Sequence, residues 1–194
     1  MVLNHLELYT DGGAIKVGKK YYGSSAFVIR YGNQYYVSSN PVQPGTNNFY
    51  ELKAMRDGLQ TIVNTYKVKH IEIWVISDSQ YSISCITEWC KDWTRHGKDY
   101  YNKQGKKIEN IDLLTEIWDL LAQLPHYRFI KIRSHISLDI DPTYEEFKRK
   151  NKLDVTREEY LLMVRYNETC DQTITHAFNL RRKALAEKMG VAFI

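Results

Sequence analysis

The sequence predicts an α/β fold in which a mixed five-stranded sheet, three antiparallel strands followed by two parallel ones, is flanked by helices. Between residues 5 and 39, three segments have the alternating or aromatic and β-branched composition of strands. After residue 48, apolar residues recur at helical spacing, interrupted by two further strand-like runs. A mixed sheet covered by helices is the packing that buries all of these apolar faces.

The first three strands are expected at residues 5–10, 22–31 and 34–39. The first one alternates and runs into Asp11-Gly12-Gly13, a turn signal that places Asp11 at the end of the strand. Gly32-Asn33 separates the other two, which predicts an antiparallel hairpin.

A helix is expected to begin near Asn48, after the breaks at Pro41 and Pro44-Gly45. Residues 71–76 are almost continuously apolar and predict a strand in the centre of the sheet. Ser79 is a candidate N-cap for the helix that follows this strand and carries Trp89.

The second half of the chain is expected to be mostly helical. A helix is predicted at residues 112–124, stopped by Pro125, and the last strand at residues 127–133. Asp141-Pro142 is typical of a helix start. Thr156 and Glu159 predict a capping box for a helix through Val164, and a final helix is expected from Glu168 to Met189, with Gly190 as its C-terminal cap.

The length of 194 residues fits one domain, expected over residues 1–194, or one domain with an appendage, and 43% hydrophobic with 26% charged residues is typical of a globular protein. The N-terminus has no signal-peptide pattern, and no apolar run approaches the roughly 18 residues that cross a membrane. The three cysteines have no metal-type spacing and are expected to be reduced thiols. We therefore expect a cytoplasmic, intracellular monomer that does not bind membranes.

Asp11, Glu51 and Asp78 occupy the expected ends or starts of three elements that an α/β sheet brings together. Converging carboxylates supply the oxygen ligands that hard divalent cations prefer. Each acid taken alone is more simply explained as a turn residue, or for Glu51 as a residue that favours the helix dipole.

The sequence motifs around these acids resemble those of the type 1 ribonucleases H. Four segments carry the resemblance: Tyr9-Thr10-Asp11-Gly12, residues 46–54 with Thr46-Asn47-Asn48 before Glu51, Ser77-Asp78-Ser79-Gln80-Tyr81, and Asn167-Glu168-Thr169-Cys170-Asp171. They occur in the family's order. The resemblance covers about residues 5–135 and 167–186 and implies the RNase H-like fold.

The resemblance implies an endoribonuclease that hydrolyses the RNA strand of RNA–DNA hybrids and leaves 5′-phosphate and 3′-hydroxyl ends. Asp11, Glu51, Asp78 and Asp171 match the family's metal-binding acids, which hold two Mg²⁺ ions. Mn²⁺ is the alternative ion, because it also accepts oxygen ligands. His135 matches a histidine of a mobile loop that assists proton transfer or product release.

The same resemblance implies contacts to the hybrid. Asn47, Asn48 and Gln80 match residues that read the minor groove, and Thr46 matches a residue that binds a DNA-strand phosphate. Residues 91–107 carry six basic residues against two acids, a net of +4 that equals the formal charge of the whole chain. This segment resembles a basic protrusion that contacts backbone phosphate. Its basic residues are Lys91, Arg95, Lys98, Lys103, Lys106 and Lys107.

The chain departs from the family pattern in a helical insertion at residues 137–166, which separates His135 from Asp171. A lid, a partner-binding helical pair and helices packed on the sheet are the alternatives for it, and its apolar residues favour packing. For the whole chain, two alternatives stay open: a DNA-processing nuclease or integrase with the same fold, and a non-catalytic nucleic-acid-binding module.

Overall fold

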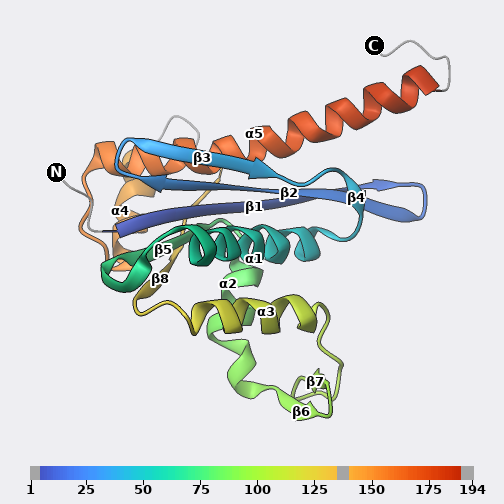
Figure 1. Ribbon diagram of the computed structural model, residues 1–194, viewed down its shortest axis with the longest axis horizontal. Coiled ribbons are helices and arrows are strands. Elements are labelled where there is room, and N and C mark those ends of the chain that lie inside the picture. Colours follow the sequence, from blue (N-terminus) through green and yellow to red (C-terminus); the bar gives the residue numbers. More distant parts are fainter. Residues whose placement is uncertain (1–4, 135–139, 189–194) are drawn as a thin grey trace.

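A mixed sheet forms the centre of the computed structural model, which describes residues 5–134 and 140–188. Its strands are β1 (His5–Val17), β2 (Lys20–Tyr31), β3 (Gln34–Ser39), β4 (Gln43–Pro44), β5 (Glu72–Ser77) and β8 (Tyr127–Lys131). They lie in the order β3-β2-β1-β5-β8, with β4 beside β2 (Figure 1). Strands β1, β2 and β3 are antiparallel, whereas β5 is parallel to β1 and to β8. The predicted sheet is confirmed, with β4 as an added short strand.

The first strand is longer than predicted. Strand β1 does not end at Asp11 but continues through both glycines, and the chain turns at Gly18, whose φ is +61°. Gly12 and Gly13 stay extended because they pair with Ser25 and Ser24 of β2. The pairing of β1 with β5 ends at Thr10, so Asp11 lies one residue beyond the point where β5 stops.

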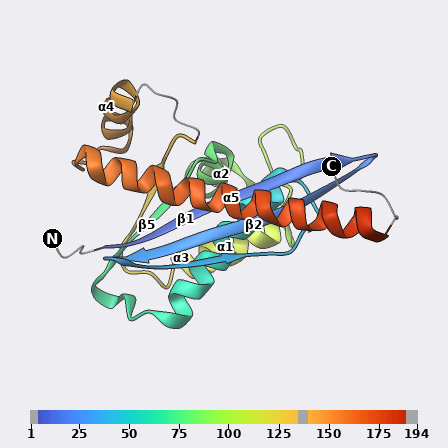
Figure 2. The ribbon, with the colours of Figure 1, turned by 90° about the horizontal axis from the view of Figure 1, so that it is seen from above.

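Helices cover both faces of the sheet (Figures 1 and 2). One face carries α1 (Asn47–Thr65), α2 (Gln80–Thr87) and α3 (Ile111–Leu121), and the other carries α4 (Ile140–Asn151) and α5 (Arg157–Lys188). Strand β5 supplies Ile73 and Val75 to the first core and Trp74 and Ile76 to the second. Its central position and nearly continuous apolar sequence agree with the prediction.

The C-terminal region holds one helix where two were predicted. Thr156 and Glu159 form the expected capping box, with the backbone N–H of each donating to the side chain of the other at 2.7 and 3.1 Å. The helix then continues to Lys188, because no glycine or proline interrupts residues 157–188. The predicted cap at Gly190 lies outside the described residues.

The described part of the insertion packs against the sheet. Phe147, Leu153, Val155 and Tyr160 are buried in the second core, together with side chains of β5 and β8. Asn151, at the end of α4, fixes this helix to the edge of the sheet. Its side chain accepts a hydrogen bond from the backbone N–H of Lys131 and donates one to the carbonyl of the same residue, both at 2.9 Å.

The basic segment at residues 91–107 contains a small hairpin that the sequence did not predict. Strands β6 (Thr94–His96) and β7 (Asp99–Tyr101) pair antiparallel and lie apart from the main sheet (Figure 1). Two 3-10 turns, η1 (Val68–His70) and η2 (Trp89–Asp92), complete the described elements, and α2 ends at Thr87 before the predicted Trp89. None of the described helices is long and apolar enough to cross a membrane.

Candidate active site

Three of the predicted acids converge beside the C-terminal end of β5, between the two inner strands β1 and β5 of the sheet. Asp11 comes from β1, Glu51 from the first turns of α1, and Asp78 from the residue that follows β5. One carboxylate oxygen of each lies within 4.8 Å of the other two. This convergence is what the separate positions in the sequence predicted, although Asp11 reaches it from within a strand.

Gly12 makes the approach of α1 to β1 possible. A β-carbon at this position would lie 2.1 Å from the backbone nitrogen of Glu51 and 2.2 Å from the carbonyl carbon of Tyr50. Both contacts are shorter than any side chain permits. The glycine after Asp11 therefore serves to bring the Glu51 backbone against the strand, and it does not form a turn.

Thr46 starts α1 in the orientation that points Glu51 at Asp11. Its side chain accepts a hydrogen bond from the backbone N–H of Phe49 at 3.3 Å, as an N-cap does. Asn47 ties the same helix end to β1, because its side-chain oxygen accepts from the backbone N–H of Ala14 at 3.2 Å. Two residues that the resemblance assigns to substrate contact thus also position the carboxylate.

The environment of Glu51 disfavours its negative charge. Its side chain is 7% exposed, and its Oε2 atom is buried without a hydrogen-bond partner among the residues that the structure describes. Burial raises the pKa of Glu51 well above its ordinary value, and the charges of Asp11 and Asp78 raise it further. The backbone N–H of Gly12 and the ammonium of Lys131 oppose that rise. A divalent cation between the three carboxylates would supply the missing partner, so this donor set fits Mg²⁺.

Lys131 is a residue of the site that the sequence motifs did not reveal. Its Nζ donates hydrogen bonds to the carbonyl oxygens of Asp78 and Ile132. Burial lowers the pKa of Lys131, against the effect of the Asp78 and Glu51 charges. The register, which pairs it with Ser77 of β5, is the signal that places Lys131 beside Asp78.

Asp171 lies on α5 and is not part of the three-carboxylate group. The thiol of the preceding residue, Cys170, donates a hydrogen bond to the carbonyl of Tyr9 at 3.7 Å and thereby sets this turn of α5 against β1. Burial raises the pKa of Cys170, as do the charges of Asp11, Asp78 and Asp171. The long helix therefore brings Asp171 to the neighbourhood of the site. His135 lies outside the described residues.

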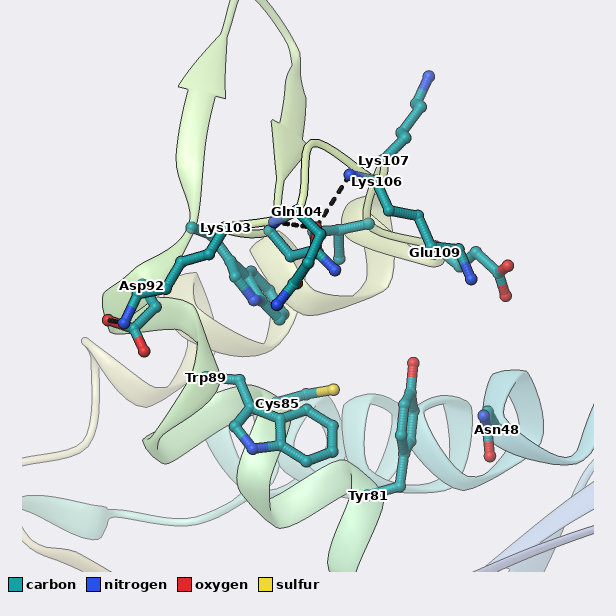
Figure 3. A pocket seen from close by; sticks show the side chains of 13 residues that line it. Asn48, Tyr81, Cys85, Trp89, Asp92, Lys103, Gln104, Lys106, Lys107 and Glu109 are labelled. Atoms are coloured by element: carbon teal, nitrogen blue, oxygen red, sulfur yellow. Dashed lines mark hydrogen bonds and ion pairs between the residues drawn. The ribbon is translucent and has the colours of Figure 1, made fainter.

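The other predicted substrate contacts border the site. Asn48 is exposed on the first turn of α1, and Gln80 is exposed at the start of α2, where its amide donates to Ser84 at 3.0 Å. A cavity of about 560 Å³ begins at Asn48 and extends below the basic segment. Figure 3 shows Tyr81 and Trp89 on one side of this cavity and Lys103, Lys106 and Lys107 on the other.

The six basic side chains of the segment 91–107 differ in the partners that they contact. Lys103 pairs with Asp92 at 2.9 Å, and Lys107 pairs with Asp99 at 2.7 Å. The guanidinium of Arg95 lies 5.7 Å from the centre of the Tyr100 ring. Three further lysines are exposed and form no ion pair with a described residue, namely Lys91, Lys98 and Lys106.

Comparison with known proteins gives one consistent result. Residues 4–153 match the family model described as RNase H. The ribonuclease H of Salmonella arizonae is 25% identical over 158 residues, which cover 81% of this chain and 96% of that protein. The same values hold for the ribonuclease H of Salmonella newport.

Solved structures agree in fold at low sequence identity. LC11-RNase H1 in complex with an RNA/DNA hybrid has a TM-score of 0.51 and 18% identity, covering 75% of this chain and 98% of that chain. The foamy viral protease-reverse transcriptase in complex with dsDNA has a TM-score of 0.55 and 18% identity, covering 75% and 93%. LC9-RNase H1, a type 1 RNase H with the type 2 active-site motif, has a TM-score of 0.50 and 16% identity, covering 86% and 84%.

Proposed function

This chain belongs to the RNase H family and is a ribonuclease H, and on that premise we propose that Asp11, Glu51 and Asp78 form the centre that hydrolyses the RNA strand of RNA–DNA hybrids. The observation that carries the proposal is the convergence of three carboxylates from three elements within 4.8 Å. The Oε2 atom of Glu51 supports it, since this atom is buried with no hydrogen-bond partner in the described part of the chain, and an acid in that place is stable as an anion only beside a cation.

In this proposal the three carboxylates, with Asp171 as a fourth ligand, hold two Mg²⁺ ions. When bound, the ions supply the Lewis acidity that in-line hydrolysis of a phosphodiester requires, with 5′-phosphate and 3′-hydroxyl ends as products. Mn²⁺ is the alternative ion. Lys131 holds the backbone of Asp78 and offsets part of the negative charge before a metal binds. His135 assists proton transfer or product release.

The hybrid is proposed to lie across the carboxylate group and the basic segment. Asn47, Asn48 and Gln80 face its minor groove, where amides both donate and accept hydrogen bonds. Thr46 binds a DNA-strand phosphate, and the basic residues of residues 91–107 contact backbone further along. The first turns of α1 and α2 hold these polar side chains beside the carboxylates.

The protein is further proposed to act as a cytoplasmic monomer. Cys85, Cys90 and Cys170 are all free thiols, which suits a reducing compartment.

A cleavage assay tests the proposed function. The protein is incubated with labelled RNA–DNA hybrid, single-stranded RNA and duplex DNA, with and without Mg²⁺. Only the RNA strand of the hybrid should be cut, and only with the metal. Cleavage of duplex DNA, or cleavage without a metal, would refute the assignment.

An aspartate pair provides the matched control. Asp78→Asn should lower kcat by more than about a hundredfold, above the loss expected for an outer partner of a metal ligand. Asp119→Asn, which changes an exposed aspartate of α3, should keep the wild-type rate. Equal rates for the two variants would exclude Asp78 from the site.

A further inference from the structure

A second cavity, of about 310 Å³, lies where the end of β8 meets α4 and the start of α5. Its volume is at the lower end of the range for ligand pockets, about 300–1,000 Å³. Among the residues that line it, Lys131, Arg133 and Lys150 are cationic and Glu146 is the one acid. The cavity therefore carries a net positive charge and favours an anion.

Tyr160 provides an unused hydrogen-bond donor in this cavity. The side chain is 0% exposed and lines the cavity, and its hydroxyl is buried with no hydrogen-bond partner among the described residues. Its ring is fixed against Phe147, with the ring centres 4.7 Å apart. Burial raises the pKa of Tyr160 to about 12, so the hydroxyl keeps its proton at neutral pH. A buried donor that lacks an acceptor among the described residues is open to an acceptor from a bound group or a water.

The cavity adjoins the carboxylate group through Lys131. Two of the three ammonium donors of Lys131 are used by the carbonyl oxygens of Asp78 and Ile132, which leaves one for a further acceptor. The charges of Lys131 and Lys150 repel each other, and an anion between them removes that repulsion. The same side chain thus touches the candidate catalytic centre and the cavity.

We propose that this cavity is a phosphate subsite that takes a backbone phosphate of the nucleic-acid strand lying across the carboxylate group. The inference rests on the proposed function for the source of the phosphate. Arg133, Lys150 and the Tyr160 hydroxyl come from three different segments, and a tetrahedral phosphate has enough acceptor oxygens for all of them.

Glu146 regulates the strength of this subsite. It pairs with Lys150 at 2.7 Å and so competes with a bound phosphate for the ammonium. Removal of its charge should therefore strengthen binding, whereas removal of the charge of Lys150 should weaken it. A general change in net charge would give the same two signs, so the distinction rests on Glu145 and Arg149, which carry the same charges on α4 but do not line the cavity.

Steady-state cleavage of hybrid by the full chain tests the subsite, with neighbouring residues of α4 as controls. Lys150→Gln should raise KM for hybrid about five- to tenfold with kcat unchanged, and Arg149→Gln, which removes the same charge outside the cavity, should leave KM unchanged. Glu146→Gln should lower KM, and Glu145→Gln should not. Equal effects within either pair, or a loss confined to kcat, would overturn the proposal.

Titration with inorganic phosphate, followed by calorimetry, separates the source of the ligand from the activity. Phosphate should bind the wild-type chain and bind Lys150→Gln and Tyr160→Phe about five- to tenfold more weakly, with Arg149→Gln unchanged. Thermal melting of Tyr160→Phe verifies that the variant is folded. If phosphate does not bind, the subsite is refuted, whether or not the chain cleaves hybrid. Phosphate binding without the KM pattern overturns its assignment to a backbone phosphate.

Discussion

The backbone nitrogen of Glu51 lies 2.1 Å from the place that a β-carbon on Gly12 would occupy. Strand β1 and helix α1 therefore meet at a point where only a glycine fits, and this point lies between two of the three converging acids. Any side chain at position 12 must move the start of α1, and with it the carboxylate of Glu51.

Gly12→Ala should therefore lower both activity and stability. Overpacking of this kind costs about 1–3 kcal/mol of unfolding free energy. A displacement of a catalytic group by about 1 Å reduces the rate about a hundredfold. Thermal melting and kcat for hybrid cleavage measure the two effects.

Gly13→Ala is the matched control for this prediction. A β-carbon there meets a side-chain methyl of Ile174 at 3.1 Å, and a side chain moves aside more easily than backbone. Its loss of activity should be much smaller. Equal losses at the two glycines would contradict the role given to Gly12.

Metal-free protein should become more stable when Glu51 is neutralised. The pKa of Glu51 is raised above its ordinary value of 4.5 by burial and by two neighbouring acids. The window lies between the pKa of Glu51 in the unfolded chain and its higher pKa in the folded chain. Within it the folded chain binds more protons than the unfolded chain, so stability falls as the pH rises. Glu51→Gln should remove this fall and raise Tm near neutral pH, by about 2–4 °C for each kcal/mol gained.

Divalent metal should reverse the order of stability of the wild-type chain and Glu51→Gln. Saturating Mg²⁺ stabilises the wild-type chain by binding its folded state, and Glu51→Gln loses a ligand and gains less. Glu88→Gln, at an exposed position outside the site, should change neither Tm nor its pH dependence. A lower Tm for Glu51→Gln than for wild type, both without metal, would show that Glu51 is not held against its charge.

Asp171 should affect metal binding more than substrate binding. It lies outside the three-carboxylate group, on a turn of α5 held against β1 by Cys170. Asp171→Asn should raise the Mg²⁺ concentration for half-maximal activity about 10–100-fold, while the affinity for hybrid stays the same. The exposed Asp154→Asn is the control. An unchanged Mg²⁺ requirement would remove Asp171 from the site.

The lysines of the basic segment should contribute unequally to binding. Lys98 and Lys106 form no ion pair with a described residue, whereas Lys103 and Lys107 already have carboxylate partners. Changing both Lys98 and Lys106 to Gln should lower the slope of log affinity against log salt by about 2, since each phosphate contact adds about 0.9.

A second pair of exposed lysines controls for charge alone. Lys67→Gln with Lys69→Gln, beside the end of α1, should leave the slope unchanged. Asp92→Asn should increase the slope, because it releases Lys103 for phosphate. A slope that depends only on net charge would contradict a localised contact.

The sequence predicted the parts of the site that depend on local patterns. The motifs around Glu51 and Asp78 lie at element starts and ends, which periodicity and capping residues locate well. The predicted end of β1 was wrong because a glycine is equally typical of a turn and of a place where two backbone segments approach closely. Only the tertiary contact with Glu51 distinguishes these two roles.

Features that depend on register or on distant packing were not predictable. Lys131 reaches Asp78 because β8 pairs with β5, a fact that one strand alone does not contain. The single helix α5 replaces two predicted helices: no glycine or proline interrupts residues 157–188, and Cys170 and Ile174 bury its middle in the second core. The hairpin of β6 and β7 is too short for periodicity to indicate.

The contact of Asn151 with β8 also bears on whether a strand of another molecule can pair with the sheet. Strand β8 is the last strand on its side of the sheet, and such a strand offers backbone groups to which another molecule can add a strand. The amide of Asn151 occupies both the N–H and the carbonyl of Lys131 as a neighbouring strand would. The helix that lines the second cavity therefore also covers the end of this open edge, at Lys131, where a strand of another molecule would otherwise find unpaired backbone groups.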